Sequence, residues 1–158
     1  MALDADGITA IYDALTTHAK VLGMFDRVGD HESTNPPGRG LSCSVLLGPI
    51  TPIKSSGLPA TSGRMEMTVR VEAPRLSTTP GRVDRDVLGA ACQLLAAYTA
   101  DFELDGVPDG LVRAIDLLGA YGTGLSMQPG WRTQDGSPYR VAEITLPLIL
   151  NDMWGQTA

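Results

Sequence analysis

The chain has 158 residues, of which 43% are hydrophobic and 19% charged, and its formal net charge is −6 at pH 7. A domain of this length can bury roughly 70% of the surface that its unfolded chain exposes, so neither a disulfide nor a structural metal is needed to hold it. The acidic balance argues against a nucleic-acid-binding face, because contact with phosphates requires a basic surface.

The first predicted element is an amphipathic helix that ends at Gly23. Apolar side chains recur at three- and four-residue spacing from Ile8 to Leu22. Asp6 is available as the N-cap, and Gly23 as the residue that stops the helix. Prolines and glycines then gather over residues 30–40, which predicts a surface loop.

Two strands are predicted next, Leu41–Leu47 and Met65–Glu72. The second alternates apolar and polar side chains without interruption, as a half-buried strand does, and Pro74 ends it. We expect the two strands to pair in antiparallel orientation.

The segment 48–63 between these strands is predicted to be one long loop. It contains three prolines and shows neither helical nor strand periodicity. Connections of this length inside a compact domain usually have a function or are disordered. Its apolar side chains favour an arm that docks on another molecule, with contacts at Ile50, Ile53 and Leu58.

The central predicted helix, Val83–Phe102, lacks the broad polar face of an ordinary surface helix. Between Asp86 and Asp101 the strongly polar side chains are Gln93 and Thr99 alone. We therefore expect this helix to be covered on two sides, by a second element or by a neighbouring subunit. The predicted core residues are Met67, Val69, Ala91, Leu95, Ile144 and Leu146.

A further strand is predicted at Leu111–Leu118, after turns rich in aspartate and glycine. The glycine-rich stretch 119–124 lacks the GxGxxG order of a dinucleotide-binding loop, so we interpret it as a bend in the sheet. No long helix follows it to hold a phosphate.

The last predicted unit is a β-hairpin around Asp135-Gly136. This dipeptide is a strong hairpin signal, and it places Trp131-Arg132 and Tyr139-Arg140 on either side of the tip. The closing strand, Arg140–Leu150, alternates again. Pro147 cannot donate to a ladder, so this strand must lie at an edge there or pair on one side only.

The order of elements predicts a single α+β domain over residues 1–158. It runs helix, two strands, helix, then two or three strands. This order indicates two main helices on one face of a mostly antiparallel or mixed sheet of about four to five strands.

No catalytic, metal or cofactor site is predicted. His18 and His31 have no second His or Cys at ligand spacing, and no serine stands in a GxSxG elbow. Cys43 and Cys92 lack CxxC spacing and a nearby His, which predicts two buried thiols in a reducing compartment. Because these catalytic patterns are missing, we do not expect an enzyme. No apolar run approaches the roughly 20 residues of a membrane helix, so we do not expect a membrane protein either.

The order of elements resembles the tail terminator proteins of long-tailed, siphovirus-type bacteriophages. The resemblance covers roughly Ile8 to Trp154 and rests on the N-terminal helix, the strand pair split by the 48–63 loop, the helix before a long turn, and the closing hairpin Pro129-Gly130-Trp131-Arg132 … Tyr139-Arg140-Val141. It implies a structural virion protein that caps the tail tube as a hexameric ring, stops tube polymerisation and forms the tail side of the head–tail joint.

The resemblance also implies partners and a place. The partners are the tail tube protein and a head–neck connector protein, while DNA passes through the lumen without specific binding. The protein would be made in the host cytoplasm and lie at the neck end of the tail. The alternatives are a head–tail connector or tail-completion protein of the same neck, and a small α+β enzyme or ligand-binding domain. The candidate assembly-interface residues are Ile50, Ile53, Leu58, Arg64, Trp131, Arg132 and Tyr139.

Overall fold

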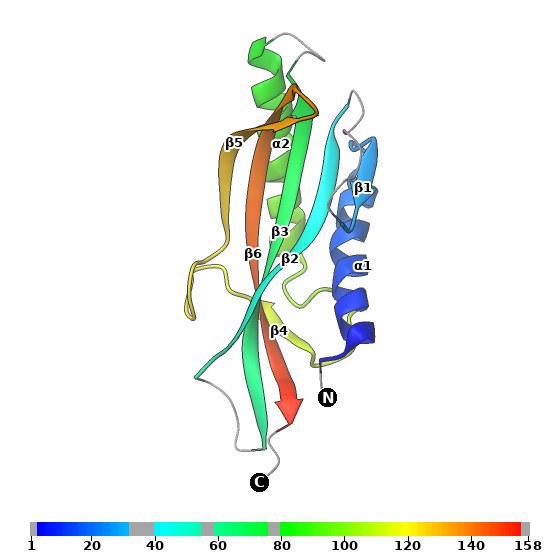
Figure 1. Ribbon diagram of the computed structural model, residues 1–158. Coiled ribbons are helices and arrows are strands. Elements are labelled where there is room, and N and C mark those ends of the chain that lie inside the picture. Colours follow the sequence, from blue (N-terminus) through cyan, green and yellow to red (C-terminus); the bar gives the residue numbers. More distant parts are fainter. Residues whose placement is uncertain (1–2, 32–39, 55–58, 76–79, 156–158) are drawn as a thin grey trace.

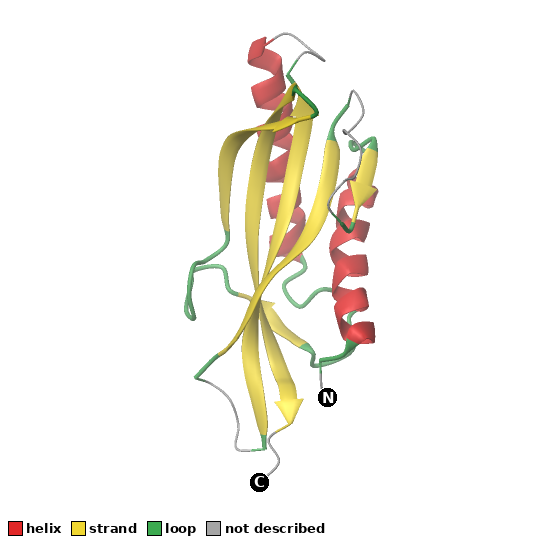
Figure 2. Ribbon diagram, in the orientation of Figure 1, coloured by secondary structure: helices red, strands yellow, loops and turns green. Residues whose placement is uncertain are grey.

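Two helices pack on one face of a curled, mixed β-sheet in the computed structural model, which describes residues 3–31, 40–54, 59–75 and 80–155 (Figures 1 and 2). This α+β architecture confirms the predicted fold class. The elements are α1 (Ala5–Leu22), β1 (Arg27–Gly29), β2 (Ser42–Pro52), β3 (Ala60–Pro74), α2 (Pro80–Ala100), β4 (Val112–Ile115), β5 (Ser126–Gln134) and β6 (Ser137–Gly155).

The long strands β3 and β6 form the middle of the sheet. Its order is β1-β2-β3-β6-β4; only the β1–β2 pair is parallel among the described strands, and β2 and β3 pair in antiparallel orientation as predicted. On its other edge, β6 pairs with two strands in turn. β5 pairs with β6 up to Thr145, and β4 pairs with β6 from Leu148 onward. Pro147 falls between these stretches and has a ladder partner only in Glu66 of β3, so the predicted one-sided pairing is confirmed for the described strands; on its other side the Pro147 carbonyl accepts a 2.9 Å hydrogen bond from the N–H of Asp116.

The core lies between the sheet and the helices. Met67 and Val69 of β3 pair with Leu146 and Ile144 of β6, and all four are fully buried as predicted. α2 adds the buried residues Val87, Ala91, Leu94 and Tyr98. The prediction for Leu95 is wrong: this residue is half-buried, because Leu94 shares the inner face with Ala91 and Tyr98 at the i, i+3, i+7 spacing.

Both helices begin slightly before their predicted starts. The N-cap of α1 is Asp4 rather than Asp6: its Oδ1 accepts a 2.8 Å hydrogen bond from the N–H of Gly7, while Asp6 lies in the first turn. Gly23 ends α1 in the left-handed conformation, as predicted. α2 begins at Pro80, a residue whose fixed φ and missing N–H suit the first helical position.

The predicted long loop at 48–63 is mostly strand. β2 continues to Pro52 and β3 starts at Ala60, with Ile50 opposite Met65. The register shifts between Leu47 and Ile50, and this irregularity breaks the two-residue period that would have revealed the strand. Beyond the helices, the ends of β2, β3 and β6 and the described residues beside them form a projection that we call the arm, residues 49–54, 59–63 and 151–155 (Figure 1).

The outward side of α2 is exposed rather than covered. Gly89, Cys92, Gln93 and Ala96 all face solvent, so the second cover predicted for this helix does not come from the described parts of the same chain. The prediction of two buried thiols is correct for Cys43 and wrong for Cys92, which follows the buried Ala91 and turns outward. In the described part of the chain, neither helix has the length and apolarity that crossing a membrane requires.

Candidate assembly interface

The predicted interface residues divide between the two ends of the sheet. Ile50 and Ile53 lie on the arm at one end, and Trp131, Arg132 and Tyr139 lie on the β5–β6 hairpin at the other (Figure 1). Two further candidates stand apart from these groups. Arg64 is buried at the base of the arm, and Leu58 lies outside the described residues.

The apolar anchors of the arm are largely used inside the chain. Ile53 is buried, and its N–H donates a 3.0 Å hydrogen bond to the carbonyl of Ser62. Gly63 has no room for a side chain, because a Cβ there would lie 1.9 Å from Cε of Met153. The large exposed apolar side chain of the arm is instead Trp154, 44% exposed and opposite Thr61. It was missed because a single aromatic residue at a strand end has no periodic signal.

The β5–β6 hairpin holds Trp131 in the open. The residue is 57% exposed, with the guanidinium of Arg140 4.7 Å from the centroid of the indole ring and that of Arg75 at 5.7 Å. Arg140 is fixed in turn: its Nη1 donates to the carbonyl of Gly130, and its Nε lies 2.8 Å from Asp84 on α2. The cation–π contact from the fixed Arg140 restrains the indole, so Trp131 is a preformed contact point.

The other two hairpin candidates are turned inward. Tyr139 is 4% exposed and is therefore buried within the chain itself. Arg132 donates a 2.7 Å hydrogen bond to Gln134 and lies 3.7 Å from the buried carboxylate of Glu72. Of the three candidates on this hairpin, Trp131 is therefore the one that is exposed to a partner.

Arg64 anchors the loop between β4 and β5. It is 6% exposed, pairs with Glu66, donates to the carbonyl of Thr123 and lies 3.8 Å from Asp116. Asp116, also 6% exposed, accepts hydrogen bonds from the N–H groups of Ala120 at 2.7 Å and Tyr121 at 3.0 Å. These buried charges fix a loop whose tip is exposed and apolar.

The helix-free face of the sheet carries balanced charges. Arg70 lies 3.0 Å from Glu143, and Arg132 faces Glu72. Beside them is an open hollow of about 260 Å³ that includes Gln128 among its lining residues. Because each of these arginines faces a carboxylate, this part of the face offers no unbalanced basic stripe to phosphates.

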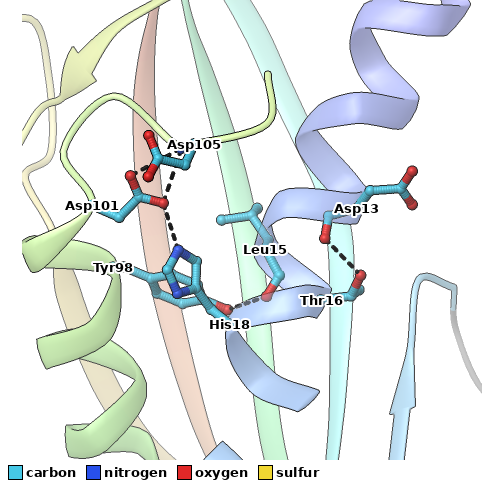
Figure 3. A network of polar contacts seen from close by, with 7 residues as sticks. All are labelled: Asp13, Leu15, Thr16, His18, Tyr98, Asp101 and Asp105. Atoms are coloured by element: carbon cyan, nitrogen blue, oxygen red, sulfur yellow. Dashed lines mark hydrogen bonds and ion pairs between the residues drawn. The ribbon is translucent and has the colours of Figure 1, made fainter. Parts of the chain in front are cut away.

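The grouping that most resembles a catalytic pair lies between the helices (Figure 3). Nε2 of His18 is 2.6 Å from Oδ2 of Asp101, whose two carboxylate oxygens also accept from the N–H of Asp105. The His18 ring meets Tyr98 edge-on, and the Tyr98 hydroxyl donates to the carbonyl of Leu15. This network joins α1 to the end of α2, so it accounts for these side chains structurally.

The pocket next to this pair has a volume of about 500 Å³ and is lined largely by small and acidic residues. The Asp13 carboxylate points away from the His18–Asp101 contact (Figure 3). No group of three or more His, Cys, Asp or Glu side chains in the described residues is placed to hold a metal ion. The two exposed tryptophans and the anchored loop remain as the features that point to an interface.

Comparison with known proteins gives the fold. No protein-family model and no curated protein matches the sequence. Among solved structures, the chain is similar to one in the virion of a native gene transfer agent particle, with a TM-score of 0.55 and 14% identity over 93% of this chain and 98% of that chain. The two chains share a fold.

A second solved structure is more distant. It is the sheath/tube terminator of an extracellular contractile injection system, PVC, in its extended state, with a TM-score of 0.44 and 15% identity. The match covers the whole of the present chain but only 60% of the length of the terminator chain.

Proposed function

We propose that this protein is a tail terminator, which caps a tail tube as a ring, stops the polymerisation of the tube and forms the tail side of a head–tail joint. The observation that supports this most is the end-to-end sharing of a fold with a chain of a gene transfer agent virion. The resemblance of the element order to tail terminators, including the confirmed β5–β6 hairpin, points the same way.

Two exposed contact points at opposite ends of the sheet suit a protein that sits at a joint. Trp154 lies on the arm, while Trp131 lies on the β5–β6 hairpin. Tryptophan is enriched among the residues that dominate binding energy. We assign one end to the tail tube protein and the other to a head–neck connector protein.

The proposed ring is a homohexamer, by resemblance, and DNA would pass through its lumen. The net charge of −6 and the paired arginines of the helix-free face fit a wall that does not retain DNA. The proposed location is the neck end of the tail, after synthesis in the host cytoplasm. In this role the protein has no catalytic residue and needs no cofactor.

Growth of tubes in vitro tests this function. Tail tube protein would be polymerised with and without the purified chain, and tube lengths measured by negative-stain electron microscopy. A terminator shortens the tubes at low molar ratio and leaves a ring of extra density at one end. Unchanged tube lengths, with the chain bound to isolated connector rings, would favour the connector of the same neck instead.

A further inference from the structure

The loop between β4 and β5 carries an exposed apolar tip. Leu118 is 99% exposed and Tyr121 is 41% exposed, and residues 117–125 include no charged side chain. We call residues 117–121 the knob. An exposed leucine is unremarkable on a mobile loop, so the question is whether this loop is held in place.

The knob is held from beneath by buried charges and tight backbone turns. Asp116 accepts from the N–H groups of Ala120 and Tyr121, and Arg64 donates to the carbonyl of Thr123. Gly119 has a φ of +79°, and a Cβ there would lie 2.4 Å from the carbonyl oxygen of Gly122. Burying two ionised side chains is costly, yet here it fixes a segment whose tip touches solvent. A rigid, exposed apolar tip binds with little loss of entropy.

The surface that receives such a tip must also be apolar and uncharged, because a desolvated charge would oppose binding. This chain carries a surface of that kind on α2. Residues at three- and four-residue spacing form an uncharged strip there, which we call the α2 strip: Leu88, Cys92, Leu95, Ala96 and Thr99. Cys92, Ala96 and Thr99 are exposed, and the two leucines are half-buried.

The knob and the α2 strip lie on different elements. The knob follows β4 at the β5 side of the sheet, while α2 lies on the helix-covered face (Figure 1). A contact between two different patches of identical chains is head-to-tail, and repetition of such a contact closes a ring when the rotation allows it. This matches the ring of the proposed function, on which the inference rests.

We propose that the knob of one copy docks on the α2 strip of the next copy, with Leu118 seated beside Cys92 and Ala96. The partner is thus a second copy of this chain. Neither surface carries a charged side chain, although 19% of the residues of the chain are charged, so the two can be desolvated against each other without burying a charge.

A disulfide trap tests the docking directly. In the Leu118→Cys variant, the new thiol would meet the natural Cys92 of the adjacent copy, whereas Cys43 is buried and cannot compete. Mild oxidation should give a ladder of covalent oligomers on a non-reducing gel. Adding Cys92→Ser should abolish the ladder. Val21→Cys, at a position that is 79% exposed near the end of α1, is the control and should stay monomeric on the gel.

A charge variant gives a second readout in solution. Leu118→Glu should raise the apparent dissociation constant of the ring by at least about 30-fold, the effect of losing a hot-spot residue, as measured by native mass spectrometry over a dilution series. Val21→Glu should leave it unchanged. At concentrations too low for rings to form, both variants should unfold at the same temperature as the wild type, because both side chains are exposed in the single subunit.

The outcomes separate this inference from the proposed function. If Leu118→Glu forms rings as stable as those of the wild type, and Leu118→Cys gives no ladder, the docking is overturned while a terminator ring remains possible. A chain that stays monomeric and gives no ladder would also overturn it. If Leu118→Glu keeps its rings but no longer shortens tubes, the knob binds the tube protein and the docking proposed here is wrong.

Discussion

Nε2 of His18 on α1 lies 2.6 Å from Oδ2 of Asp101, one residue beyond the end of α2. The same carboxylate accepts hydrogen bonds from the N–H of Asp105, so the Asp101 side chain joins α1 to the turn that follows α2. The helices are therefore clamped at one end by a polar contact as well as by the apolar core.

We expect His18→Ala to lower the free energy of unfolding by about 1–2 kcal/mol, because it removes a hydrogen bond to a charged group at a half-buried site. Thr17→Ala, at an exposed neighbouring position, is the control and should change it by less than about 0.5 kcal/mol. Equal effects of the two substitutions in urea unfolding would show that the clamp does not contribute.

The adjacent leucines of α2 should respond differently to truncation. Leu94 is fully buried and Leu95 is half-buried. We expect Leu94→Ala to cost about 2–5 kcal/mol and Leu95→Ala about 1 kcal/mol in the isolated subunit. Chemical denaturation of both variants checks this. A greater loss for Leu95→Ala would mean that α2 is rotated about its axis relative to the structure.

The fold could be predicted from the sequence where local chemistry and tertiary contacts agree. The dipeptide Asp135-Gly136 predicts the β5–β6 hairpin because a two-residue hairpin turn favours residues that tolerate a positive φ. The two residues have φ angles of 50° and 78°. The extension of β2 could not be found in the same way. A register shift at Gly48-Pro49 interrupts the alternation, and the glycine is required because a Cβ there would lie 2.7 Å from the carbonyl oxygen of Glu66.

The candidate interface was harder to predict than the fold. Trp131 stands out in sequence as an aromatic residue beside a hairpin turn, and the structure leaves it exposed. Arg64 and Tyr139 look equally available in sequence, yet both are buried by contacts with distant segments. For Leu118 the error is the reverse. An apolar residue in a predicted strand is expected to be buried, but Leu118 lies in the anchored loop after β4 and is exposed.

The two cysteines should differ in reactivity. Burial raises the pKa of the Cys43 thiol from 9.0 to about 12, whereas Cys92 is exposed. Native protein at pH 8 should therefore take up one equivalent of iodoacetamide, at Cys92, and a second after unfolding, as read by mass spectrometry. Uptake of two equivalents by the native chain would contradict the burial of Cys43.

The same thiol predicts how stability depends on pH. Because the pKa of Cys43 is higher in the folded than in the unfolded state, folding favours the protonated thiol. Its contribution is complete below pH 9.0 and is lost as the pH rises toward about 12. Cys43→Ala should weaken this alkaline loss in thermal unfolding at pH 9 to 11. An unchanged pH profile would assign the loss to other groups.

Removal of the loop anchor should loosen the knob and destabilise the chain. Asp116→Ala takes away the acceptor for the N–H groups of Ala120 and Tyr121 and leaves Arg64 without one of its carboxylate partners. We expect a loss of about 3–5 kcal/mol and faster amide hydrogen exchange over residues 117–125. Asp109→Ala, in an exposed turn, is the control. Unchanged exchange in Asp116→Ala would show that other contacts hold the loop.

The central claim, that this chain ends the growth of a tail tube, is tested most directly by deleting its gene from the genome that encodes the particle and measuring the tails by electron microscopy. We predict overlong tails, or tails unjoined to heads, and rescue by the wild-type chain supplied from a plasmid. Tails of normal length that are joined to heads in the complete deletion would contradict the account.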